Sequence, residues 1–108
     1  MSDQSKDDRI TLLQAYVREE PNDPFNRYAL ALEWIRLGHN MEAIEQFEML
    51  RQYHASYLPT YYQLGKVLES LNRIEEAILV YTEGIEVALK QGASKTASEL
   101  RSALDFLE

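Results

Sequence analysis

The sequence predicts an all-α protein built from repeated helical hairpins, and three observations favour this class. A motif recurs, since Glu42-Ala43-Ile44 returns 34 positions later as Glu76-Ala77-Ile78. Apolar residues follow helical spacings of three and four, and strand-like alternation is nearly absent. The 108 residues include only four Gly and three Pro, which suits long helices with short turns. A fixed period of this length is typical of stacked units that cannot bury their apolar faces alone.

Six helices are expected, and the first two have clear ends. The first covers about residues 7–20, with Asp7 or Asp8 as its N-cap. Its apolar stripe is Ile10, Leu13, Tyr16 and Val17. The second covers residues 24–37, because Asp23 is a natural N-cap and Pro24 suits the first helical position. Gly38 should end it in the left-handed conformation.

Turn-forming residues also mark the later helices. The third is expected over residues 41–53 with Asn40 as its cap, and the fourth over residues 59–71, where Asn72 tolerates the positive φ of a helix stop. Gly92 should end the fifth, over residues 74–91. The sixth runs from Ser94 or Thr96 to about residue 107, and Thr96 with Glu99 would form a capping box. No connection exceeds about six residues, so successive helices should be antiparallel neighbours.

Length, charge and composition restrict the class of protein. We expect a single domain over residues 1–108. The net charge of −7 and the scattered Lys and Arg residues disfavour nucleic acid and anionic membranes as partners. The absence of Cys excludes disulfides and thiolate metal sites. No apolar segment is long enough to span a bilayer, and the polar N-terminus lacks signal-peptide features, so a cytoplasmic protein is expected.

Catalytic, metal and cofactor chemistry are not indicated. His39 and His54 lie in expected turns and have no second ligand at helical spacing. Neighbouring carboxylates such as Glu75 and Glu76 point about 100° apart on a helix and cannot share a substrate. The sequence contains no Gly-rich phosphate loop and no Cys–His pair. We therefore expect no catalytic residue, no metal and no cofactor.

The repeat resembles the tetratricopeptide repeat, whose 34-residue signature is W-x2-L-G-x2-Y, then A-x3-F, then P. Residues 24–57 form the first copy and residues 58–91 the second. The matching positions are Arg27, Leu30, Ala31, Trp34, Ala43 and Phe47, then Tyr61, Leu64, Gly65, Leu68, Ala77 and Tyr81. Small residues such as Ala31 and Gly65 are expected where two helices approach closely, and Phe47 and Tyr81 between the helices of one hairpin. The chain departs from the signature at Arg27, Ala55, Gly84 and Leu89.

The resemblance implies a short right-handed α-solenoid, with a half repeat over residues 7–20 and a capping helix over residues 94–107. It also implies a noncatalytic protein-interaction module that holds an extended peptide or a partner helix in a concave groove. The candidate partner-binding residues are Phe25, Tyr28, Leu32, Ile35, Arg36, Tyr62, Gln63, Lys66 and Glu69. The family's carboxylate clamp is not expected, because Tyr28, Leu32 and Gln63 stand where it needs Lys and Asn. An apolar groove with a charged rim is expected instead.

Three alternatives remain open. The stripe of Tyr28, Leu32 and Ile35 is equally compatible with burial under the neighbouring helix. The same stripe is compatible with a symmetric homodimer. The chain is also compatible with a fragment of a longer solenoid, although the polar outer face of the last helix argues against this. That face comprises Lys95, Ser98, Arg101, Ser102 and Asp105.

Overall fold

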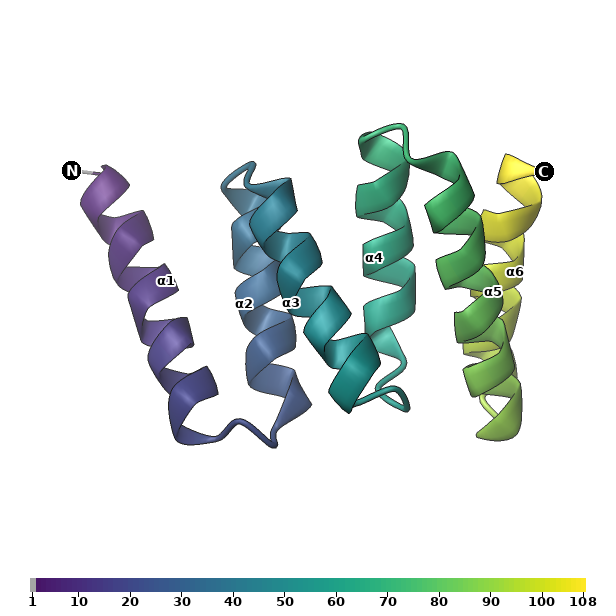
Figure 1. Cartoon of the computed structure of the whole chain (residues 1–108), viewed down its shortest axis with the longest axis horizontal. Coiled ribbons are helices and arrows are strands. Elements are labelled where there is room, and N and C mark those ends of the chain that lie inside the picture. The colour runs from purple at the N-terminus through teal and green to yellow at the C-terminus, as the bar shows by residue number, and fades with distance from the viewer. Residues whose placement is uncertain (1) are drawn as a thin grey trace. The chain divides into compact units, whose positions relative to one another are not determined.

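The computed structural model describes the backbone of residues 2–108 and the side chains of residues 8–108. Over this range it contains six helices and no strand, which confirms the all-α helical repeat fold (Figure 1). The helices are α1 (Ser2–Glu19), α2 (Pro24–Arg36), α3 (Asn40–Tyr53), α4 (Pro59–Ser70), α5 (Ile74–Lys90) and α6 (Ser94–Leu107). They form two compact units, one ending at His54 and one beginning at Ala55.

The first unit contains α1, α2 and α3, and α2 packs against both of the others. Its buried apolar side chains come from all three helices. They are Ile10, Leu30, Ala31, Ala43, Ile44, Phe47 and Leu50. α2 is therefore the helix that both others of this unit contact.

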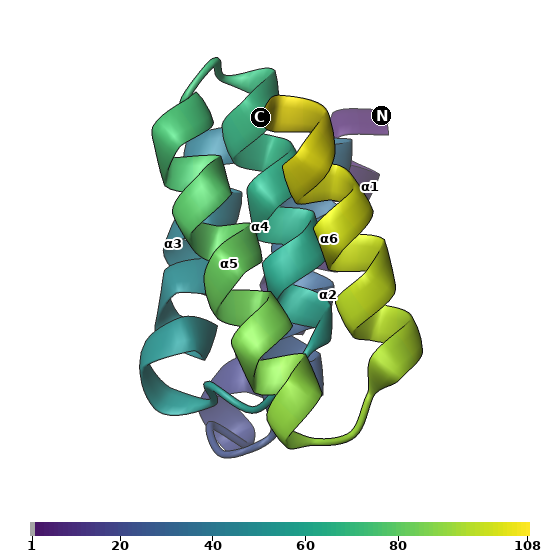
Figure 2. The same cartoon turned by 90° about the vertical axis from the view of Figure 1, so that its right-hand side faces the viewer.

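The second unit contains α4, α5 and α6, and here α5 is the central helix. Figure 2 shows α6 running beside α5 in the opposite direction. The largest fully buried side chains of this unit are Thr60, Tyr61, Leu64, Tyr81 and Leu100. On α6, Ala97, Leu100, Ala103 and Leu104 are buried. The last helix therefore buries one face at these four positions, and its predicted polar outer face is exposed.

Three of the helices end in the same way, as the turn residues predict. Gly38, Asn72 and Gly92 have φ values of 80°, 59° and 72°. After α2, the N–H of His39 donates to the carbonyl of Trp34 and the N–H of Gly38 to that of Ile35. This pair of bonds satisfies carbonyls that the helix end leaves open. The same two bonds recur after α4 and α5, so short turns join each helix to the next.

These short turns also explain why several predicted N-caps are wrong. The residue that completes each turn is also the N-cap of the next helix, so His39, Arg73 and Ala93 cap α3, α5 and α6 without a side-chain bond. Asn40 is therefore already helical, and the capping box of Thr96 with Glu99 does not form. The predicted N-cap Asp23 is confirmed, because its carboxylate accepts the N–H of Phe25 at 3.0 Å.

The start of the first helix differs most from the prediction. The helix begins at Ser2, so Asp7 and Asp8 lie inside it and neither is its N-cap; the side chain of Asp7 lies outside those described. Since a carboxylate inside a helix has only a weak cost, Asp7 and Asp8 do not stop the helix from extending.

Two positions of the second unit require glycine because α4 and α5 approach closely there. A Cβ atom on Gly65 would lie 2.1 Å from Cε1 of Tyr81, and one on Gly84 would lie 2.6 Å from Cβ of Tyr61. Real Cβ atoms do not come this close to other atoms. Gly65 and Gly84 thus allow two buried tyrosines to lie between α4 and α5, as was predicted for Gly65 and Tyr81.

Candidate functional site

The candidate residues on α2 share one side of that helix. At about 100° per residue, Phe25, Leu32 and Arg36 point in nearly the same direction, and Tyr28 and Ile35 lie beside them. Phe25 is 59% exposed, and Arg36 is also exposed. Tyr28, Leu32 and Ile35 are half-buried. The result is a largely apolar strip with one cation at its C-terminal end, and its role in binding remains a prediction.

Tyr28 also takes part in the packing of the first unit. Its ring centre lies 6.2 Å from that of the buried Phe47 of α3, at an interplanar angle of 55°. Such tilted contacts between rings are favourable. The ring therefore has a fixed position at the edge of the strip, where part of its surface remains accessible.

The candidate residues on α4 form a more polar surface. Tyr62 is 39% exposed, and Nζ of Lys66 lies 5.4 Å from the centre of its ring. Lys66 also pairs with Glu69, with Nζ 3.5 Å from Oε2. Gln63 is half-buried beside them. This surface presents an aromatic ring and a cation to solvent, both held by neighbours on the same helix.

Glu69 has an additional role that the sequence did not reveal. Its carboxylate accepts a hydrogen bond from the hydroxyl of the buried Tyr81 on α5. Burial, together with this bond to a carboxylate, raises the pKa of the Tyr81 hydroxyl. Glu69 thus satisfies a buried polar group inside the second unit, besides its place at the edge of the candidate surface.

A buried carboxylate in the first unit was missed by the sequence analysis. Glu33 of α2 is only 5% exposed. Its two oxygens accept bonds from Nε of Arg36 at 3.0 and 3.1 Å, and Nη2 of Arg36 bonds to Oε2 as well. Nε of Arg9 on α1 lies 3.2 Å from Oε1. We call Arg9, Glu33 and Arg36 the arginine cluster.

The arginine cluster has a clear electrostatic consequence. The hydrogen bonds from Arg36 and the positive charges of Arg36 and Arg9 hold the pKa of Glu33 below its usual value, although burial opposes this shift. Glu33 is therefore ionised at neutral pH. A sequence signal for the cluster existed, since Glu33 interrupts the apolar residues of α2 and Arg36 follows it at the helical spacing of three.

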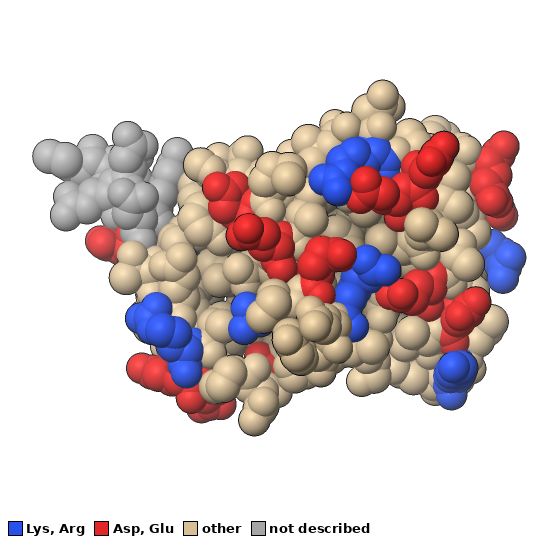
Figure 3. Space-filling model, viewed as in Figure 1, with Lys and Arg blue, Asp and Glu red and all other residues tan. Residues whose placement is uncertain are grey.

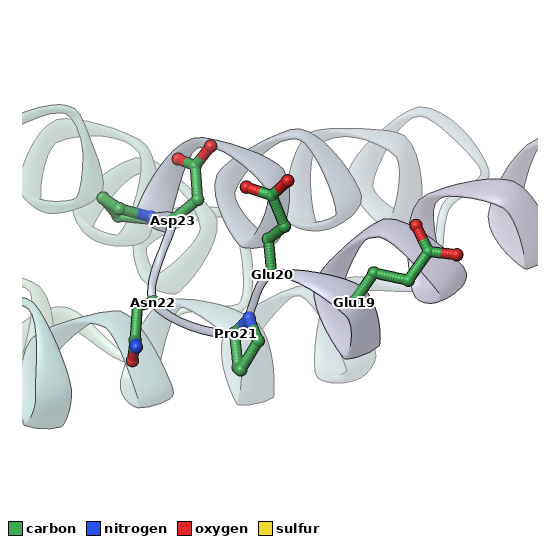
Figure 4. Close-up of a pocket in the computed structure, with 6 residues that line it drawn as sticks. Glu19, Glu20, Pro21, Asn22 and Asp23 are labelled. Atoms are coloured by element: carbon green, nitrogen blue, oxygen red, sulfur yellow. The ribbon is translucent and has the colours of Figure 1, made fainter.

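Three surface hollows formed by described residues each include at least two carboxylates. The close-up in Figure 4 shows one at the turn between α1 and α2, lined by Glu19, Glu20, Pro21, Asn22 and Asp23 together with Pro24. The Asp23 carboxylate there is already bonded to the backbone of α2. Over the described residues, no group of three or more His, Cys, Asp or Glu side chains is arranged to hold a metal ion.

The surface that faces the viewer in Figure 3 carries mixed charges. Acidic groups are spread over the regions of α3 and α5, with basic groups between them and no extended basic area in this view. Oppositely charged residues also pair locally, such as Arg51 with Glu48 on α3 and Arg73 with Glu76 at the start of α5. Within the described residues, no helix combines the length and the apolar character needed to cross a bilayer.

Two solved structures are similar to this chain in both sequence and fold. One is a solution NMR structure of a tetratricopeptide repeat domain protein from Salinibacter ruber, with 44% identity and a TM-score of 0.78. It matches 82% of this chain and 89% of that protein chain. The other is a crystal structure of a tetratricopeptide repeat domain protein from the same organism, with 43% identity and a TM-score of 0.74. Here 80% of this chain and 96% of the other are covered. No protein-family model and no curated protein matches the chain.

Proposed function

Because the chain belongs to the tetratricopeptide repeat family, we propose that it is a noncatalytic protein-interaction module that binds an extended peptide or a partner helix. The proposed contact surface is the strip of Phe25, Tyr28, Leu32, Ile35 and Arg36 on α2, and the exposed residues of α4 are a second, separate surface. The observation that carries the proposal is the strip on α2, where a large aromatic side chain is more than half exposed beside half-buried aliphatic residues.

The composition of the strip supports a protein partner. Phe25, Leu32 and Ile35 offer apolar area that gains free energy when it is removed from water. Arg36 adds a planar cation, a residue type enriched at protein interfaces. Since the helix backbone is fixed by packing on α1 and α3, little conformational entropy is lost when a partner binds.

The surface on α4 contributes a different chemistry. Tyr62 and Lys66 are exposed, and each is held in place by a neighbour. Tyr rings bind apolar and polar groups at low entropic cost, and the cation sets the register of a partner through charge. The α4 surface is therefore the more polar and more selective of the two proposed contact surfaces.

The experiment is a selection of peptides from a random display library against the full chain. Enriched peptides should bind the wild type and lose at least about tenfold in affinity on Leu32→Glu, because a buried charge opposes an apolar contact. Tyr62→Ala should weaken binding less. Circular dichroism and thermal unfolding confirm that each variant is folded. A library that yields no binding peptide, or peptides that bind Leu32→Glu as well as the wild type, would refute the proposal.

A homodimer through the same strip is the second candidate, favoured by the exposure of Phe25 at 59%. Symmetric pairs bury the same patch on both copies. Light scattering over a concentration series decides this point, because a dimer would show a molar mass that doubles with concentration and falls back in Leu32→Glu. A constant monomer mass up to high micromolar concentration rules the homodimer out.

A further inference from the structure

Glu33 is the one charged side chain that is buried among the described residues. Its equivalent in the second repeat, 34 positions later, is Val67, which is also buried. An apolar side chain is thus compatible with the repeat at this position. Replacing a buried ion pair by apolar residues is often neutral or stabilising, so packing alone gives no reason for a carboxylate here.

The two arginines of the cluster remain accessible. Arg9 is 66% exposed and Arg36 is 55% exposed, although Arg36 hydrogen-bonds to the buried carboxylate of Glu33 and Arg9 forms an ion pair with it. One negative charge faces two positive charges, so the cluster carries a net positive charge. Among the described side chains, both Nη atoms of Arg9 and Nη1 of Arg36 have no carboxylate partner. Each guanidinium therefore keeps donors for a further acceptor.

We propose that Arg9 and Arg36, held in place by Glu33, bind the carboxylate of an acidic side chain in a peptide partner. This inference rests on the proposed function, and it names the partner's chemistry at one end of the α2 strip. Guanidinium groups match carboxylates with paired hydrogen bonds. Because Glu33 fixes both arginines before binding, less side-chain entropy is lost when the partner's carboxylate arrives.

The surroundings restrict the class of peptide. Leu32 lies one helical turn before Arg36 on the same side of α2, and Phe25 lies further along that side. The chain as a whole carries a net charge of −7, which repels a strongly acidic partner. The peptide that fits has one acidic residue among apolar and uncharged ones. Arg9 lies on α1, away from the positions of the family's carboxylate clamp, which hold Tyr28, Leu32 and Gln63 here.

The test measures the side-chain Nε–Hε signals of the arginines by NMR in the full chain, during titration with three probes. The probes are the capped peptide acetyl-Ala-Leu-Ala-Glu-Ala-Leu-Ala-amide, the same peptide with Gln in place of Glu, and inorganic phosphate. We expect the Glu peptide to shift the Arg9 and Arg36 signals in a saturable way, with a dissociation constant of roughly 1 mM or tighter. The Gln peptide should give no saturable shift.

Variants assign the effect to the cluster. Arg9→Gln and Arg36→Gln should each weaken binding of the Glu peptide by about tenfold, the effect of losing a charged hydrogen bond. Arg18→Gln is the matched control, because it removes the same charge from an exposed position of α1 and should leave the affinity unchanged. Arg9→Gln keeps the pair of Arg36 with Glu33, so its fold can be verified even if Arg36→Gln is unstable.

Three results would overturn the inference: no saturable shift with the Glu peptide, equal shifts with the Gln peptide, or saturation by phosphate alone. Its failure is distinguishable from failure of the proposed function. If display peptides depend on Leu32 but bind Arg9→Gln as tightly as wild type, the interaction module stands and the carboxylate site does not. If no peptide depends on Leu32, the proposed function itself fails.

Discussion

The two hairpins, α2 with α3 and α4 with α5, share one repeat and yet fill the space between their helices differently. In the first hairpin Arg27 reaches Gln46 with a hydrogen bond of 2.8 Å, and Leu50 is fully buried. At the equivalent places the second hairpin has the buried Tyr61, and Gly84 against its Cβ. A larger core side chain on one helix is thus matched by a smaller one on the other.

A second set of positions shows the same compensation with a change of polarity. Ala31, Ile35 and Phe47 of the first hairpin correspond to Gly65, Glu69 and Tyr81 of the second. The tyrosine ring lies against the glycine, and its hydroxyl bonds to the glutamate. The comparison indicates that the repeat specifies the distance between the two helices of a hairpin. Different combinations of residues can fill that distance. The outward sides differ in consequence, one apolar on α2 and one polar on α4.

The largest expected effect comes from removing volume in the first hairpin. Leu50→Ala should lower the free energy of unfolding by about 3 kcal/mol, because it leaves a cavity at a fully buried position. Urea unfolding of the full chain measures this loss. Met49→Ala on the same helix is the control, since Met49 is 37% exposed and should cost less than about 1 kcal/mol. Equal losses would show that Leu50 does not fill the hairpin.

Adding volume at the equivalent place in the second hairpin should be nearly as harmful. Gly84→Ala places a methyl group 2.6 Å from Cβ of Tyr61, and the backbone atoms near that carbon cannot move freely. We expect a loss of about 2 kcal/mol, although alanine favours the helix. Thr82→Ala, at an exposed position of α5, is the control. A stabilised Gly84→Ala protein would mean that the helices do not approach closely there.

The polar pair of the second hairpin can be exchanged for the apolar pair of the first. Tyr81→Phe leaves Glu69 without its buried donor, and Glu69→Ile leaves the tyrosine hydroxyl without its acceptor. Each single variant should lose about 1 kcal/mol. The double variant should lose less stability than the two single variants together, because it has the same two residue types, Phe and Ile, that the first hairpin has at these positions. Strictly additive losses in the double-mutant cycle would contradict this coupling.

The same tyrosine predicts a difference at alkaline pH. The folded state raises the pKa of Tyr81, so the folded protein holds this proton where the unfolded chain releases it. Stability is therefore lost as the pH rises above the usual tyrosine value of about 10. Urea unfolding at neutral and alkaline pH should show a smaller loss for Tyr81→Phe than for the wild type. Identical pH profiles would argue against a raised pKa of Tyr81 in the folded protein, which burial and the bond to Glu69 cause.

The smallest expected effect concerns the position where Glu33 and Val67 correspond. The lowered pKa of Glu33 stabilises the protein above the usual glutamate pKa, and this contribution is lost as the pH falls through the folded-state value. Because Arg9 and Arg36 are more than half exposed, the contribution should be below about 1 kcal/mol. Glu33→Val should therefore flatten the acid limb of the stability profile. An unchanged limb would show that the arginine cluster does not affect folding.

Much of the fold was readable from the chain because it depends on local rules. The positive φ at Gly38, Asn72 and Gly92, and the cap at Asp23, follow from residue types that tolerate or satisfy helix ends. The caps at Asn40 and Thr96 were wrong because the residues that complete the turns, His39 and Ala93, are themselves the N-caps. The predicted start of the first helix at Asp7 or Asp8 was wrong, because an aspartate inside a helix lowers helix stability only slightly.

The candidate surface was less readable from the sequence. Spacing places Phe25, Leu32 and Arg36 on one side of α2, which any helix would do. That Glu69 bonds to Tyr81, and that Glu33 joins two arginines, depends on which helices pack together and at what rotation. Glu69 lies more than one helical turn from Tyr81 in the sequence, and Glu33 lies more than one turn from Arg9. Helical spacing therefore could not predict these two pairs.

The sequence by itself determined the helices and the repeat, because these follow from periodicity and from backbone preferences of single residues. Only the tertiary structure decided where charges are buried and which small residues are required. Burial and close approach depend on distances between helices, and those distances result from all the side chains between them at once.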